Sequence, residues 1–186
     1  MNYLKLIFTA ALVSAFLPLS AAHADPSDNW DIMTNPLGLI LGVNANLQYK
    51  ISDQMTIGPN LTLISVNIND FKMNGFGIGV SSDYYFDQAF KTGWYMSGGL
   101  GFDSFGLSYT DSDNNHFSQN VSNFSVKALG GYKWFWGHSF NLTLGLGLAG
   151  NFPSQSSVTS DNGKQTKSVP LSGIGLAGDA SIGWTF

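Results

Sequence analysis

The sequence predicts an all-β fold: a transmembrane, up-and-down antiparallel β-barrel of eight strands that follows a cleaved signal peptide. Apolar residues recur at every second position over unusually long runs, and this period of two is typical of strands. Runs of about ten residues match tilted membrane strands better than the five or six residues of soluble sheets. The connectors between the runs alternate between short and long, as an up-and-down barrel requires.

The composition excludes several classes of protein. All 12 acidic residues are Asp and all 8 basic residues are Lys, so the strong helix formers Glu and Arg are missing. A net charge of -4 and a pI of about 5.0 disfavour a nucleic-acid partner. With no cysteine, disulfides, thiolate zinc sites and cysteine nucleophiles are excluded as well.

The N-terminus has the pattern of a secretory signal. Lys5 precedes an apolar run from Leu6 to Leu19, and Ala22-His23-Ala24 is a small-x-small cleavage motif. Pro18 interrupts the run, which is short for the ~20 residues of a membrane helix. We expect residues 1–24 to be the signal peptide and residues 25–186 to form one exported barrel domain.

Seven strands are evident from the alternation, and an eighth is inferred because single-chain bacterial barrels have an even number. The first strand is expected at Trp30–Thr34, turned by Asn35-Pro36 into a run that starts at Leu37. Alternation changes phase near Ile64 and near Ser104, where we expect bulges or strand ends. The other runs centre on residues 55–63, 76–86, 94–102, 124–136, 140–148 and 174–186.

The second face of these strands is small or polar and carries few charges, as a narrow lumen would select. The charged positions expected in this lumen network are Lys50, Asp83, Asp103, Lys127, Lys133 and Asp179. Asp103 and Lys127 lie on consecutive strands and are candidates for an ion pair. Two interpretations stay open, a filled polar core and a solute path, and the filled core is favoured because one network can satisfy all its members.

Connectors and aromatic residues predict the orientation. Short connectors are expected around residues 52–54, 87–92 and 137–139, and long, polar, extracellular ones at 67–74, 110–119 and 153–168. A periplasmic aromatic girdle is expected from Tyr49, Tyr84, Phe86, Phe90, Trp94, Tyr132, Trp134, Trp136, Phe140, Trp184 and Phe186. A looser outer set comprises Phe71, Phe76, Tyr109, Phe117, Phe124 and Phe152.

The signal peptide, the alternating strands and the terminal Ile182-Gly183-Trp184-Thr185-Phe186 resemble the small bacterial outer-membrane β-barrels, the group of the OmpA transmembrane domain, OmpX and OmpW. The resemblance covers nearly the whole mature chain and selects no single member family. It implies that Trp184 and Phe186, the third-from-last and last residues, are the signal that the outer-membrane assembly machinery reads.

Candidates for chemistry are few. His116 shares one expected loop with Asp111, Ser112, Asp113 and Ser118, the residue types of a nucleophile, a base and an orienting carboxylate. A lipid-modifying enzyme is therefore an alternative, although no residue is assigned a catalytic role. Asp111, Asp113 and Asn115 have the opening spacing of a calcium loop, but His116 replaces the required Gly. No metal or cofactor is expected.

The expected function is that of a monomeric integral protein of the Gram-negative outer membrane, with a structural or surface-interaction role through its extracellular loops. Its expected partners are outer-membrane lipid, lipopolysaccharide and the assembly machinery. The first alternative is a narrow, OmpW-like channel for small or hydrophobic solutes, and the second is the lipid-modifying enzyme.

Overall fold

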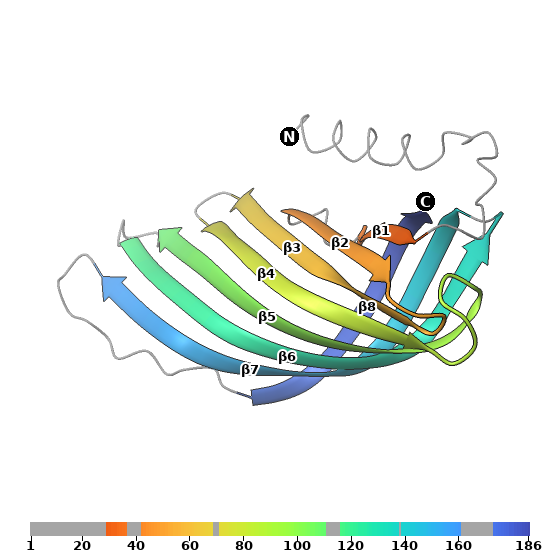
Figure 1. Cartoon of the computed structure of the whole chain (residues 1–186). Coiled ribbons are helices and arrows are strands. Elements are labelled where there is room, and N and C mark those ends of the chain that lie inside the picture. The colour runs from red at the N-terminus through yellow and green to blue at the C-terminus, as the bar shows by residue number, and fades with distance from the viewer. Residues whose placement is uncertain (1–28, 37–41, 69–70, 111–115, 138, 161–172) are drawn as a thin grey trace.

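The chain folds into a closed antiparallel barrel of eight strands, in which each strand pairs with the next and the last pairs with the first. The computed structural model describes residues 29–36, 42–68, 71–110, 116–137, 139–160 and 173–186 (Figure 1). None of these segments is a helix long and apolar enough to cross a bilayer. The predicted signal peptide lies outside them. The strands are β1 (Trp30–Thr34), β2 (Gly42–Lys50), β3 (Met55–Ile68), β4 (Phe71–Tyr85), β5 (Gly93–Thr110), β6 (His116–Trp136), β7 (Phe140–Ser160) and β8 (Gly173–Thr185).

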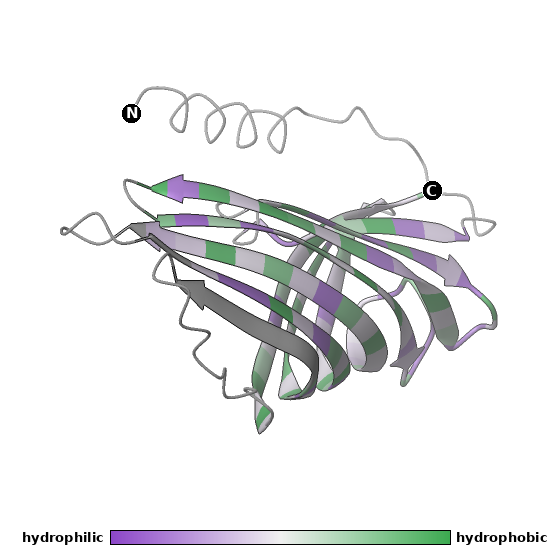
Figure 2. Cartoon of the chain, turned by 90° about the vertical axis from the view of Figure 1, so that its left-hand side faces the viewer, coloured by the Kyte–Doolittle hydropathy of each residue, from purple (hydrophilic) through white to green (hydrophobic). Residues whose placement is uncertain are grey.

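The eight strands and the all-β class confirm the prediction from the alternation. Successive side chains of a strand point to opposite faces, so the period of two separates a lumen face from an outer face. Figure 2 shows this alternation as bands of hydrophobic and hydrophilic colour along the strands. Lumen positions such as Asp83 and Lys133 are buried, whereas outward positions such as Val80, Trp94 and Leu146 are exposed.

The short strand β1 closes the barrel. It confirms the predicted first strand and pairs with β8 through Asp31↔Thr185 to Thr34↔Ile182. The backbones of Trp30 and Phe186 exchange two hydrogen bonds of 3.0 and 2.8 Å, so the C-terminal residue completes the seam. The strand expected from Leu37 begins at Gly42 in the structure, and residues 37–41 lie outside the described segments.

The connectors at one end of the barrel are as short as predicted, at residues 51–54, 86–92 and 137–139. We call this the short-connector end; β1 and the C-terminus lie there, at the right of Figure 1. At the opposite end the strands are longer than predicted. Asn67 pairs with Lys72 and Ile68 with Phe71, so the expected connector at 67–74 is wrong and only residues 69–70 join β3 to β4.

The predicted bulges near Ile64 and Ser104 are also wrong, because pairing runs through both positions without a shift. A register shift occurs instead between Ser122 and Asn123, opposite Pro153, whose missing N–H interrupts the ladder. The change of phase in the alternation marks the point where the two faces of the sheet exchange their apolar and polar residues, which we call the inversion of polarity. Beyond it the lumen-side positions are apolar, among them Val66, Met73, Phe105 and Leu107, and the outward positions are polar, among them Ser65, Asn74, Ser104 and Ser122.

Hydrogen bonds link these outward polar residues across the strands. The Ser65 hydroxyl donates to Asn74 Oδ1 at 3.0 Å, and the Ser104 and Ser122 hydroxyls lie 3.1 Å apart. On the other side of the sheet Val66 is 9% exposed. The far ends of the strands thus have the polarity of a water-soluble sheet, whereas the central barrel has the reverse polarity.

Candidate functional site

A buried ammonium group organises the lumen near the short-connector end. Lys133 Nζ donates to Asp83 Oδ2 at 2.8 Å and to Tyr85 Oη at 3.0 Å. The rings of Tyr85 and Tyr95 lie 5.1 and 5.0 Å from the same nitrogen, within reach of cation–π attraction. Lys133 is 1% exposed and Asp83 4% exposed, so water does not reach the pair.

Neutral and acidic side chains complete this layer. Asn141 Nδ2 donates to Asp31 Oδ1 at 2.8 Å, and Gln48 Nε2 donates to Ser81 Oγ at 2.9 Å and to Asn46 Oδ1 at 2.8 Å. We call the buried set the plug; it comprises Asp31, Met33, Gln48, Ser81, Asp83, Tyr85, Tyr95, Lys133, Asn141 and Thr143. Because its members come from β1, β2, β4, β5, β6 and β7, the plug bridges the barrel from wall to wall.

The connector between β4 and β5 packs against the plug on the side of the short-connector end. Ala89 is 4% exposed, and its N–H donates to the carbonyl of Asp53 at 2.7 Å. Phe90 adopts a positive φ of 65°, and its ring lies 6.4 Å from those of Tyr85 and Phe135. Phe90 therefore caps the lumen and does not join the outer girdle for which the sequence proposed it.

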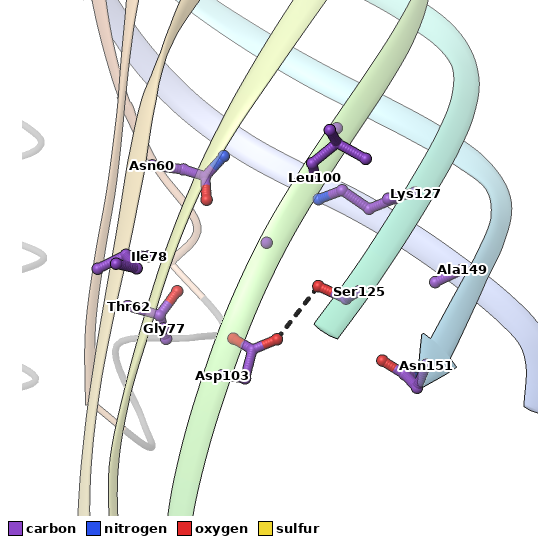
Figure 3. A pocket seen from close by; sticks show the side chains of 12 residues that line it. Asn60, Thr62, Gly77, Ile78, Leu100, Asp103, Ser125, Lys127, Ala149 and Asn151 are labelled. Atoms are coloured by element: carbon purple, nitrogen blue, oxygen red, sulfur yellow. Dashed lines mark hydrogen bonds between the residues drawn. The ribbon is translucent and has the colours of Figure 1, made fainter. Parts of the chain in front are cut away.

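On the other side of the plug the lumen is hollow. Leu129, 5% exposed, stands between Lys133 and Lys127 on the lumen face of β6. Beyond it a cavity of about 260 Å³, which we call the cup, is lined by Asn60, Thr62, Gly77, Ile78, Gly99, Leu100, Gly101, Asp103, Ser125, Lys127, Ala149 and Asn151. Figure 3 shows Asp103 and Lys127 projecting into this space from neighbouring strands.

The structure distributes the predicted lumen charges over four places. Asp83 and Lys133 meet in the plug, and Lys50 pairs with Asp53 at 3.2 Å beside the short-connector end. Asp179 accepts a hydrogen bond of 2.5 Å from Ser181. Asp103 and Lys127 share the cup but do not form the expected ion pair within 4.0 Å.

Asp31, Tyr85 and Tyr95 are among the plug residues that sequence analysis did not assign to the lumen. Tyr85 is in phase with Asp83, and Tyr95 with Asp103, so the alternation placed both rings on the lumen face. Neither ring was included in the predicted lumen network or in the predicted girdle. Asp31 belongs to a strand of only five residues, whose alternation is too short to assign a face.

The outer face carries two rows of aromatic residues. Near the short-connector end, Trp94, Tyr132 and Trp134 form ring contacts with centroids 5.2 and 4.8 Å apart. Trp136, Phe140 and Trp184 continue this row at 5.7 and 5.4 Å. The second row is Phe76, Phe102, Phe124 and Phe152, which occupy paired or adjacent positions of β4 to β7.

The two rows are separated by a band of exposed aliphatic side chains. Tyr132 and Phe124 are eight residues apart on β6, which is roughly 27 Å along a strand at ~3.4 Å per residue. Val80, Leu100, Val126, Leu144, Leu146 and Leu148 are exposed within this band. Phe71 and Tyr109 of the predicted outer set lie on the lumen-side parity, beyond the inversion of polarity.

The candidates for catalysis and for a metal are not assembled by the described residues. His116 starts β6 opposite Thr110, and Ser118 pairs with Ser108. Asp111, Ser112, Asp113 and Asn115 lie outside the described segments. Within those segments, no group of three or more potential metal-binding side chains occurs.

Comparisons of the chain with protein-family models, with curated proteins and with solved structures found no match.

Proposed function

We propose that this chain is an integral outer-membrane β-barrel protein of a Gram-negative bacterium, with a structural or surface-interaction role and a non-conducting lumen. The observation that carries the proposal is the outer face of the barrel. Exposed Leu and Val side chains occupy a band between two aromatic rows. Such a band, about 25 Å tall and flanked by aromatic girdles, is the surface by which transmembrane barrels contact lipid.

The inversion of polarity supports the same proposal. Beyond the second aromatic row, the outward hydroxyls of Ser104 and Ser122 are hydrogen-bonded to each other, and Val66 is buried on the lumen side. A sheet that leaves lipid for water must exchange its apolar face for a polar one. The strand ends beyond Phe76 and Phe124 would then project from the membrane and carry the loops toward lipopolysaccharide or another surface.

The predicted leader and terminal strand complete the proposal. Residues 1–24 would direct export, and Trp184 and Phe186 would be recognised by the outer-membrane assembly machinery. Trp184 packs against Phe140 at 5.4 Å on the outer face, and Phe186 is 59% exposed beside the seam. The barrel would act as a monomer.

The test is insertion into lipid. We expect the purified chain to fold into phospholipid vesicles, to resist added protease in the strand segments between the two aromatic rows, and to migrate differently on a gel before and after boiling. The folded β-sheet signal in circular dichroism should be lost only on boiling. A chain that folds fully in buffer without lipid or detergent would contradict the proposal.

The plug bears on the channel alternative. Lys133, Asp83, Gln48 and Asn141 are each buried to 4% exposure or less, which supports a lumen that is filled at this layer. We expect the wild-type chain to produce no ionic current across a planar bilayer. The variant Tyr85→Ala/Tyr95→Ala, which removes the two rings over Lys133, should produce discrete conductance steps. Regular steps from the wild type would favour the channel.

A further inference from the structure

We propose that the cup binds a small zwitterion, a molecule of amino-acid size that carries one ammonium and one carboxylate group. The cup holds both charges that such a ligand needs, Asp103 for the ammonium and Lys127 for the carboxylate. Its volume of about 260 Å³ lies just below the range of about 300–1,000 Å³ typical of drug-sized ligands. The lumen contacts support the inference itself, and its test rests on the proposed function because it uses protein purified from membranes.

The carboxylate of Asp103 and the ammonium of Lys127 are not neutralised by an ion pair with each other. Asp103 Oδ2 accepts one hydrogen bond, from Ser125 Oγ at 3.2 Å, and the Asp103 carboxylate forms no ion pair with Lys127. Lys127 is exposed, although its side chain points into the cup (Figure 3). The plug shows the opposite arrangement, in which Lys133 is 1% exposed and held by Asp83 at 2.8 Å. A role limited to filling the lumen would predict the same pairing in both layers.

The neutral residues of the cup match the same class of ligand. In Figure 3 the Lys127 ammonium extends toward the side of Asn60, and the Asp103 carboxylate lies on the side of Ser125. Asn60, Thr62 and Asn151 line the same cavity and add amide and hydroxyl groups around the two charges. Two separated opposite charges with neutral donors and acceptors around them favour a zwitterion over a simple anion or cation, because a simple ion can pair with only one of the two charges.

Small residues keep the cup open. Gly77, Gly99, Gly101 and Ala149 all occupy lumen positions of its wall. At Gly99 the nearest atom to an added Cβ would be the Val80 carbonyl oxygen at 3.4 Å, and the next is Ser81 Cβ at 3.5 Å. These are close to ordinary van der Waals distances, so packing does not demand glycine at this position. The missing side chain serves instead to leave space beside Asp103 and Lys127.

The experiment uses L-serine as the probe and saturation-transfer NMR as the readout, with the protein purified in detergent from the membranes of expressing cells. N-acetyl-L-serine lacks the ammonium, and L-serinamide lacks the carboxylate, so the pair tests each charge of the cup. We expect saturation transfer to L-serine and a response at least about tenfold weaker for either analogue. No transfer to L-serine, or equal transfer to all three, would overturn the inference.

Variants test the residues. Asp103→Asn and Lys127→Gln should each weaken L-serine binding about tenfold or more, whereas Lys91→Gln, in the β4–β5 connector, should not change it. Gly99→Leu should abolish binding by filling the cup. Its matched control is Gly98→Leu on the outer face, where an added Cβ has no neighbour within 4 Å.

A gel shift on boiling shows which variants are folded. If Gly99→Leu fails to fold, Asp103→Asn and Lys127→Gln decide the question. Binding that persists unchanged in both of these folded variants would overturn the inference. A folded, lipid-inserted barrel that does not bind L-serine would also overturn the inference, but it would leave the proposed function intact.

Discussion

Lys133 and Asp83 face each other across the lumen from β6 and β4, and their charged atoms lie 2.8 Å apart although β5 separates the two strands. Both side chains are almost completely buried. A buried charge requires a partner, since the desolvation of an uncompensated ion is far more costly than that of a pair. The pair therefore specifies how the lumen faces of β4 and β6 meet across the intervening β5.

Breaking this pair should destabilise the barrel strongly. We expect Lys133→Met or Asp83→Asn to lower the free energy of unfolding by about 3–5 kcal/mol, because each leaves one buried charge uncompensated. The double variant should lose less than the sum of the two. Urea unfolding in vesicles, followed by tryptophan fluorescence, measures these differences.

The matched control for the ion pair is Lys50→Met. Lys50 pairs with Asp53, whose side chain is 87% exposed, so solvent screens the interaction. This substitution should change stability by no more than about 1 kcal/mol. Equal losses from Lys133→Met and Lys50→Met would contradict the role assigned to the plug.

Tyr95 reaches across the lumen to the backbone of Gly145. A Cβ added at Gly145 would lie 2.5 Å from Tyr95 Oη, so Gly145→Ala must displace the ring that covers Lys133. We expect a loss of about 1–3 kcal/mol from this overpacking. Gly175→Ala on β8 is the control, because nothing lies within 4 Å of its added Cβ. Comparable unfolding midpoints for the two alanine variants would contradict this account.

Leu146 tests the outer band. It is 78% exposed and lies midway between Phe140 and Phe152 on β7. In a bilayer, Leu146→Lys should cost about 2–4 kcal/mol, since a lysine at the midplane must be taken out of water. Asn74 also points outward but lies beyond the second aromatic row, so Asn74→Lys should lower the free energy of unfolding by at most about 1 kcal/mol. If both substitutions are tolerated alike in vesicles, the band between the rows does not face lipid.

Phe186 has two separable roles. Its backbone closes the seam with Trp30 through bonds of 3.0 and 2.8 Å, whereas its side chain is exposed. We expect Phe186→Ala to keep the folded stability in vesicles within about 1 kcal/mol, because an exposed side chain contributes little. Its yield in the outer membrane of cells should fall several-fold, as measured by immunoblotting of membrane fractions. Leu176→Ala, also exposed on β8, serves as the control for yield.

The alternation along the chain was enough to predict the strands and their two faces. Runs such as Phe140–Leu148 have one period and one possible placement of their large residues, so their assignment needs no partner strand. The phase changes near Ile64 and Ser104 were visible in the same way but misinterpreted as irregularities. Their meaning, an exchange of the apolar face, depends on where the barrel stops and the projecting sheet begins.

The lumen contacts could not be predicted from the sequence. Asp103 and Lys127 lie on neighbouring strands and looked like partners, yet Lys133 pairs with Asp83 two strands away. Closing a barrel tilts its strands and staggers their registers, so residues close along the sheet can stand at different heights of the lumen. The sequence by itself thus determined which residues face inward in the long central runs of alternation. Closure of the tilted sheet decided which of them meet in the plug and which stay apart in the cup.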